Sequence, residues 1–265
     1  MSSITFNRDC MEVMREYPDK YFDLAVVDPP YGGGAADADT HTPTHTHTHT
    51  HGGLVGGAGE YKGAIIGRFG GHFSSYHLGG ETRRNMGAEI PKGTTGAAEA
   101  DIRHWDIAPP PEYFRELARV SKNQIIWGGN YFDLPPTRCF LVWKKLTISE
   151  NFTMAMAEYA WTSFNDNAKV FEAAPQAKPG EKRFHPTQKP VDLYAWIYKL
   201  YTKPGFKILD THMGSQSSRI AAYDAGLDYV GCEIDKTYFD LGEERFQKHT
   251  AQANLFLMGQ QSLLE

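Results

Sequence analysis

Four consecutive residues, Asp28, Pro29, Pro30 and Tyr31, combine a carboxylate, a rigid turn and an aromatic ring. The carboxylate and a proline carbonyl can accept both N–H bonds of an exocyclic amine, while the tyrosine can stack on the heterocycle that carries it. The preceding segment 22–27 is apolar and β-branched, which predicts a strand. Two prolines end that strand, because each lacks a backbone donor. The alternative is that the tetrapeptide is only a strand end with a Pro-Pro turn and a capping aspartate, and that it has no catalytic role.

A second set of candidate residues lies near the carboxyl end. Asp210 ends a predicted strand, Gly214 and Ser215 form a turn before a predicted helix, and Glu233 ends the next predicted strand. Glycine lets the backbone approach a ligand, a helix N-terminus favours an anionic group, and a second-strand carboxylate can bind ribose hydroxyls. The full G-x-G-x-x-G of dinucleotide sites is missing. A ligand with a ribose and a carboxylate but no pyrophosphate, such as S-adenosylmethionine, therefore fits this unit; a solvated strand-end acid is the alternative.

The elements that must position these residues alternate along the chain, which predicts an α/β fold. We expect Val170 and Phe171 to pair with the strand that precedes them. The expected strands lie near residue 4 and at 22–27, 123–127, 139–143, 154–164, 206–210 and 229–233, and the expected helices at 10–16, 112–120, 190–201, 217–225 and 235–247.

Length and composition indicate one large domain with an insert. The chain has 265 residues, a net charge of −5 and three scattered cysteines, so a disulfide framework is not expected and a reducing cytoplasm is. No apolar run is long enough to span a bilayer. We expect a catalytic domain at 1–31 and 105–265, a flexible Gly/His-rich insert at 32–104, and a small target-recognition lobe at 145–183. A Thr/His tract at 40–51 is either solvated low complexity or a transition-metal site.

Taken together, the motifs resemble the DNA amino-methyltransferases, in the permuted motif order of the β-group and its phage-type members. The resemblance covers residues 4–31 and about 105–248. It rests on the tetrapeptide 28–31, the segment His185-Pro-Thr-Gln-Lys-Pro190, the unit 208–215 with Glu233, and the segments Trp127-Gly-Gly-Asn130 and Ala160-Trp-Thr-Ser163. It implies a Rossmann-like fold, a mostly parallel sheet with helices on both faces, and S-adenosyl-L-methionine as cofactor.

The resemblance also implies roles for individual residues. Asp28 and the Pro29 carbonyl would hold the target amine, Asp9 would meet the adenine edge of the cofactor, and Lys189 would pair with a carboxylate. The implied catalytic residues are Asp28, Pro29, Pro30 and Tyr31. The implied cofactor-binding residues are Asp9, Asp28, Thr187, Gln188, Lys189, Asp210, Thr211, Gly214, Ser215, Glu233 and Ile234. No metal site is implied.

The family resemblance implies transfer to adenine N6 in double-stranded DNA after base flipping. N4-cytosine is the alternative target, and a DNA-binding relative with weakened cofactor binding is another, because Gln216 stands where the family usually has glycine. A positive φ there would cost ~1 kcal/mol. No residue indicates whether the protein forms a homodimer, and none identifies a restriction endonuclease partner. The expected phosphate contacts are the arginines of the insert, Lys144, Lys145, Lys178, Lys182 and Arg183.

Overall fold

A computed structural model describes residues 1–32, 107–149, 155–175 and 183–261, with side chains up to residue 252. Eight strands form one sheet in the order β1-β8-β7-β2-β3-β5-β4-β6. The strands are β1 Ser3–Phe6, β2 Phe22–Val27, β3 Ser121–Trp127, β4 Phe140–Lys145, β5 Ala157–Thr162, β6 Lys169–Ala173, β7 Lys207–Asp210 and β8 Asp228–Cys232. The predicted insert and its Thr/His tract lie outside the described residues.

The sheet is mostly parallel, as expected. Only β5 runs against its neighbours, β3 and β4, and every other pairing is parallel. The expectation that Val170 and Phe171 pair with the strand before them is wrong, because β6 pairs with β4 instead. Both sides of β5 are already paired, with β3 and with β4, so β6 pairs with the free side of β4 and forms the edge of the sheet.

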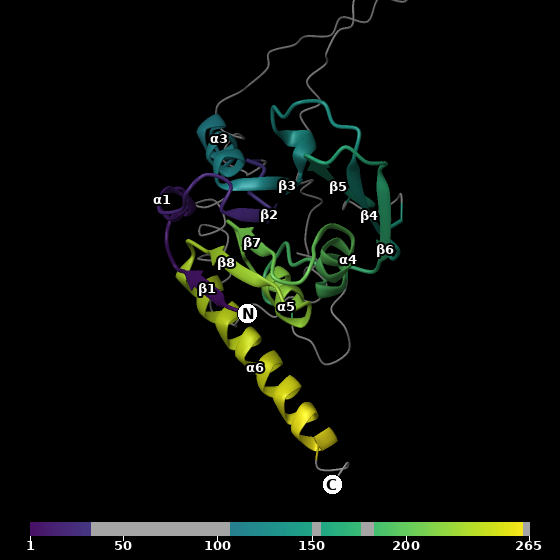
Figure 1. Ribbon diagram of the computed structural model, residues 1–265. Helices are drawn as coiled ribbons and strands as arrows, with labels where there is room; N and C mark the ends of the chain where they lie inside the picture. Colours follow the sequence, from purple (N-terminus) through teal and green to yellow (C-terminus); the bar gives the residue numbers. More distant parts are fainter. Residues whose placement is uncertain (33–106, 150–154, 176–182, 262–265) are drawn as a thin grey trace, which may run out of the picture.

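Helices cover both faces of the sheet, which confirms the predicted architecture (Figure 1). The helices are α1 Cys10–Arg15, α3 Pro111–Val120, α4 Val191–Tyr201, α5 Ser217–Asp224 and α6 Lys236–Gln261, with a short 3-10 turn η2 Gly129–Tyr131. Leu117 of α3 packs with Phe22 and Ile126 on one face. Leu193 and Ile197 of α4 pack on the other.

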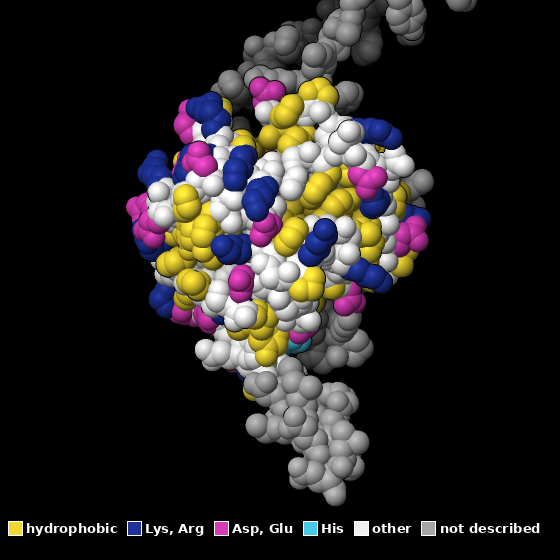
Figure 2. Space-filling view, in the orientation of Figure 1, with side chains coloured by type: hydrophobic (Ala, Val, Ile, Leu, Met, Phe, Trp, Pro, Cys, Tyr) yellow, Lys and Arg dark blue, Asp and Glu magenta, His cyan; other side chains and the backbone are white. Residues whose placement is uncertain are grey.

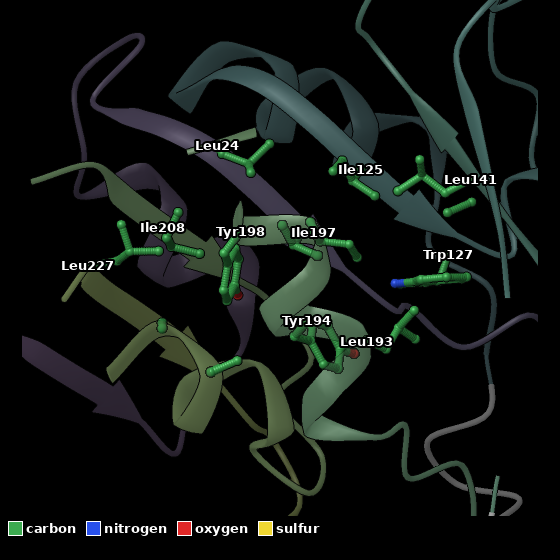
Figure 3. Close-up of a cluster of buried hydrophobic side chains, with 14 of the residues drawn as sticks. Leu24, Ile125, Trp127, Leu141, Leu193, Tyr194, Ile197, Tyr198, Ile208 and Leu227 are labelled. Atoms are coloured by element: carbon green, nitrogen blue, oxygen red, sulfur yellow. The ribbon is translucent and has the colours of Figure 1, made fainter. Parts of the chain in front are cut away.

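The buried hydrophobic cluster around α4 holds this helix against the sheet. Figure 3 shows Leu193, Ile197 and Tyr198 of α4 among side chains from β2, β3, β4 and β7. Leu193 and Ile197 are fully buried, and their spacing of four residues places them on one helix face. Because α4 begins at Val191, two residues after Lys189, this packing also anchors the end of the segment 185–190. No helix in the described part of the chain is long and apolar enough to cross a membrane.

Candidate active site

The two predicted centres meet at one edge of the sheet. β2 and β7 are parallel neighbours, with Leu24 opposite Ile208 and Ala25 opposite Leu209. Their carboxyl ends therefore lie side by side, and Asp28 and Asp210 follow from adjacent strands. Open α/β sheets bind ligands at this edge. The arrangement brings the tetrapeptide 28–31 to the same edge as the turn around Gly214.

Asp28 is held by two partners, one on each carboxylate oxygen. The hydroxyl of Tyr31 donates to Oδ1 over 2.8 Å, and the ammonium of Lys189 donates to Oδ2. The Asp28 side chain is 15% exposed, so it retains access from outside. A carboxylate oxygen has two lone pairs, so each oxygen can accept one more hydrogen bond. Asp28 is oriented by the protein and still has capacity for a ligand amine.

Tyr31 stacks on a second aromatic ring that the sequence did not single out. The rings of Tyr31 and Tyr131 lie 4.7 Å apart at 19°, and Tyr131 is 52% exposed. Gly128 passes beneath Tyr31 with a φ of +66°, and a Cβ there would lie 2.1 Å from the tyrosine ring. Burial, then the charge of Asp28, holds the pKa of Tyr31 well above its usual value. Tyr31 therefore stays a hydroxyl that can donate to Asp28.

Lys189 lies between two carboxylates rather than at the surface. Besides Asp28 it faces Glu158, with Nζ 3.1 Å from Oε2, and Lys145 Nζ lies 2.6 Å from Oε1 of the same glutamate. Burial alone would raise the pKa of Glu158, but Lys189 and Lys145 outweigh it and lower that pKa to about 2. Sequence reasoning missed Glu158; the only signal was an acidic residue within a predicted strand. The placement of Lys189 near the cofactor carboxylate stays a prediction.

Glu233 organises the glycine turn. Its Oε2 accepts a hydrogen bond from the Gly214 N–H at 2.8 Å, and its Oε1 accepts one from the Asp235 N–H at 2.9 Å. Gly214 has a φ of +46°, and a Cβ there would lie 3.1 Å from the ring of His185. Burial raises the pKa of Glu233. One lone pair on each oxygen remains for a diol, which is compatible with the predicted ribose contact.

Asp210, the last residue of β7, is buried. Its carboxylate accepts hydrogen bonds from Ser218, from the Tyr229 hydroxyl at 3.1 Å and from the His212 N–H at 3.1 Å. Burial raises its pKa to about 6, against the hydrogen bonds that lower it. Thr211 beside it pairs with the hydroxyl of Tyr113. Asp210 thus fixes the loop that follows β7.

The segment 185–190 closes over this turn. The ring of His185 contacts Gly214 and lies 4.4 Å from the ring of Tyr238 at the start of α6. The Thr187 N–H donates to His185 Nδ1 at 3.3 Å, and Gln188 Oε1 accepts from the Phe184 N–H at 3.4 Å. Burial, then Lys189, lowers the pKa of His185 to about 3, so its ring is neutral.

Gln216 has the positive φ that would be costly for a residue with a side chain. Its φ is 59° and its ψ 26°, directly before α5. The side chain of Gln216 is fully buried and points to α6, where its Nε2 donates to Oε1 of Glu243 at 3.2 Å. The Oε1 of Gln216 accepts a hydrogen bond from Arg219 at 2.8 Å. The strain is therefore offset by hydrogen bonds to charged groups.

Three further predicted residues have contacts within the protein or are exposed. Asp9 caps α1, where its carboxylate accepts from the Met11 and Glu12 N–H groups. Ile234 is 61% exposed. Ser215 is buried, and its carbonyl accepts from Arg245 at 2.8 Å. The cofactor contacts of these residues stay predictions.

Only some of the predicted phosphate contacts lie in the part of the chain that the structure describes. Lys145 is buried and paired with Glu158, so its assignment as a solvated phosphate contact is wrong. Lys144 is exposed and paired with Glu172, and Arg183 donates to the carbonyls of His185 and Pro186. On the face in Figure 2, basic and acidic side chains are interspersed. Among the described residues, no group of three His, Cys, Asp or Glu side chains could hold a metal ion.

Comparisons with known proteins find similarity to methylases over part of the chain. Residues 117–244 match the family described as DNA methylase. A protein of Escherichia coli (strain K12), YubD, whose description as a methylase is itself provisional, is 36% identical over 63 residues. That match spans 24% of this chain and 28% of the relative.

Two solved structures are similar over almost the whole chain. The cytosine-N4-specific PvuII DNA methyltransferase has a TM-score of 0.53 at 11% identity, covering 98% of this chain and 94% of that one. The complex of M1.HpyAVI with SAM has a TM-score of 0.44 at 15% identity, covering 91% and 98%. The PvuII likeness confirms the predicted Rossmann-like α/β fold, and the match over 117–244 confirms the resemblance to DNA methylases.

Proposed function

We propose that this chain, a relative of the DNA methylases through residues 117–244, transfers a methyl group from S-adenosylmethionine to adenine N6 in DNA. The observation that carries the proposal is the adjacency of two strand ends. Asp28 follows β2 and the Gly214 turn follows β7, and these strands are parallel neighbours. An amine held at Asp28 and a donor held at the turn would therefore face the same space.

The residues at the turn fit the proposed cofactor chemically. Glu233 is fixed by two backbone N–H groups and keeps lone pairs for ribose hydroxyls. Gly214 contributes no side chain, so the ring of His185 can pack against the turn. When bound, S-adenosylmethionine would supply an electrophilic methyl group on its sulfonium.

The protein's part in the reaction is to hold the amine and stabilise its developing charge. The lone pair of an aromatic amine is delocalised into its ring, so the amine is a weak nucleophile. N–H bonds donated to Asp28 and to the Pro29 carbonyl would localise charge on the nitrogen as it attacks. Preorganised acceptors of this kind, together with in-line positioning, would supply most of the rate enhancement over the uncatalysed reaction. Tyr31 would contact the ring.

Adenine is favoured over cytosine by the aspartate that opens the tetrapeptide, because the resemblance associates this residue with adenine. N4-cytosine is the alternative, and the PvuII likeness shows only the fold. Either base must leave the duplex to reach Asp28, at a cost of a few kcal/mol for unstacking. Exposed Tyr131, stacked on Tyr31, is available to take part in holding a flipped base.

The test is methyl transfer by the full chain from tritium-labelled S-adenosylmethionine to DNA, followed by digestion to nucleosides. Label in N6-methyl-2′-deoxyadenosine is the expected result, and label in N4-methyl-2′-deoxycytidine would replace the substrate assignment. Calorimetric titration with S-adenosylmethionine separates an enzyme from a DNA-binding relative that has lost the cofactor. Absence of both binding and transfer would overturn the proposal.

A further inference from the structure

Four charged side chains alternate in sign along one line of contacts, in which the two lysines are buried and the two carboxylates are partly exposed. Lys145 pairs with Glu158, Glu158 faces Lys189, and Lys189 pairs with Asp28. The side chains of Lys145 and Lys189 are 7% and 3% exposed. Buried charges of this kind persist only when they are paired, so the line behaves as a unit.

The four residues come from separate segments of the chain, two of them on neighbouring strands. Lys145 ends β4, Glu158 lies on the antiparallel strand β5, and Lys189 precedes α4. The ring of Trp127, at the end of β3, lies 5.4 Å from Lys189 Nζ. Trp127 is fully buried, so the lysine is bounded by an aromatic ring as well as by two carboxylates.

We propose that Glu158 is a positioning residue that, braced by Lys145, holds Lys189 so that Asp28 presents a fixed carboxylate to the target amine. The proposal rests on the proposed function. Glu158 contacts neither the amine nor the cofactor; it acts through Lys189.

Two features of the geometry support this role. Tyr31 takes Oδ1 of Asp28 and Lys189 takes Oδ2, so rotation of the carboxylate requires Lys189 to move. Lys189 is itself shared with Glu158, which keeps part of its charge away from Asp28. Without Glu158 the ammonium would pair with Asp28 alone, and Asp28 would become a weaker and less fixed acceptor.

The chain contains a matched control on the neighbouring strands. Lys144 and Glu172 form a Lys–Glu pair at 2.7 Å like that of Lys145 and Glu158, but both side chains are more than half exposed. Glu172→Gln removes the same charge without touching Lys189. Glu158→Gln leaves the line with one excess positive charge, whereas Lys145→Gln with Glu158→Gln restores neutrality.

The experiment measures three quantities in the full chain: single-turnover methyl transfer, S-adenosylmethionine affinity by calorimetry, and amine labelling of Lys189 followed by mass spectrometry. Glu158→Gln is expected to slow transfer by ~10- to 100-fold through misplacement of Asp28. Cofactor affinity should be unchanged and Lys189 should label faster. Glu172→Gln should match the wild type in all three.

The double variant decides between positioning and mere stability. If the double variant regains wild-type stability but still transfers methyl groups slowly and still labels Lys189 faster than the wild type does, the positioning role holds. If transfer recovers together with stability, or if Glu158→Gln leaves transfer and labelling unchanged, the proposal is overturned. A wild-type protein that transfers no methyl group would refute the proposed function instead, and the labelling of Lys189 would still show whether Glu158 holds it.

Discussion

Lys189 and Asp28 form a buried ion pair although 161 positions separate them in the chain. One residue belongs to the segment before α4 and the other to the end of β2. The pair joins the two parts of the candidate site, and it makes both residues sensitive to substitution in different ways.

Asp28→Asn is expected to lower methyl transfer by ~100-fold or more, because the amide removes the negative charge that stabilises the attacking nitrogen. Single-turnover transfer from labelled S-adenosylmethionine measures this. Asp23→Asn, at the opposite end of β2, is the control and should retain activity. Equal rates in Asp28→Asn and the wild type would contradict the assigned role.

Lys189→Met is expected to lower the free energy of unfolding by ~3–5 kcal/mol, because Asp28 loses the ammonium that pairs with it and Glu158 keeps Lys145 but loses its second lysine. Urea unfolding at pH 7 measures the change. Lys144→Met, which breaks an exposed pair with Glu172, should cost less than about 1 kcal/mol. Similar losses in both variants would show that the buried pair is no more important than a surface one.

Gln216→Gly tests whether the positive φ or the buried side chain dominates. Relief of the left-handed conformation is worth ~1 kcal/mol, but loss of hydrogen bonds to charged groups costs ~1.5–3 kcal/mol. We therefore expect net destabilisation by ~0.5–2 kcal/mol in urea unfolding, since Arg219 and Glu243 lose a partner. A stabilised variant with tighter cofactor binding would instead mean that Gln216 is a defect in the turn.

Asp210 predicts a specific pH dependence of stability. Its pKa is about 6 in the folded protein against an ordinary value of 3.8, so the folded state holds an extra proton between these values. This group therefore makes stability fall as pH rises through that window. Relative to the wild type, the free energy of unfolding of Asp210→Asn should therefore rise by about 2 kcal/mol between pH 4 and pH 7.

The measurement for Asp210 is urea unfolding of both proteins at several pH values. The comparison uses the difference between variant and wild type, since Asp210→Asn also alters the hydrogen bonds to Ser218 and Tyr229. Asp19→Asn, which removes an exposed carboxyl, is the control. A difference that does not vary with pH would show that Asp210 is not the buried acid inferred from its surroundings.

Local patterns in the sequence were sufficient for the elements and for the position of the motifs. A strand end is marked by the apolar run before Asp28 and the two prolines after it. Gly214 marks the turn before α5, and Gly226 marks the end of that helix. These signals are local because hydrogen-bond donors and φ preferences act within a few residues. They also place Asp28 and Glu233 at strand ends, the edge where ligands bind.

Only the tertiary structure decided which of these residues meet. The pairing of β6 with β4 and the contact of Glu158 with Lys189 depend on the order of strands across the sheet, which no local pattern encodes. Burial of Lys145 and the hydrogen bonds that offset the strain at Gln216 likewise arise from packing between distant elements. The sequence by itself determined which chemical groups are available at the strand ends. The packing of distant segments determined which of them are paired, because charge pairing and burial are properties of neighbours in space.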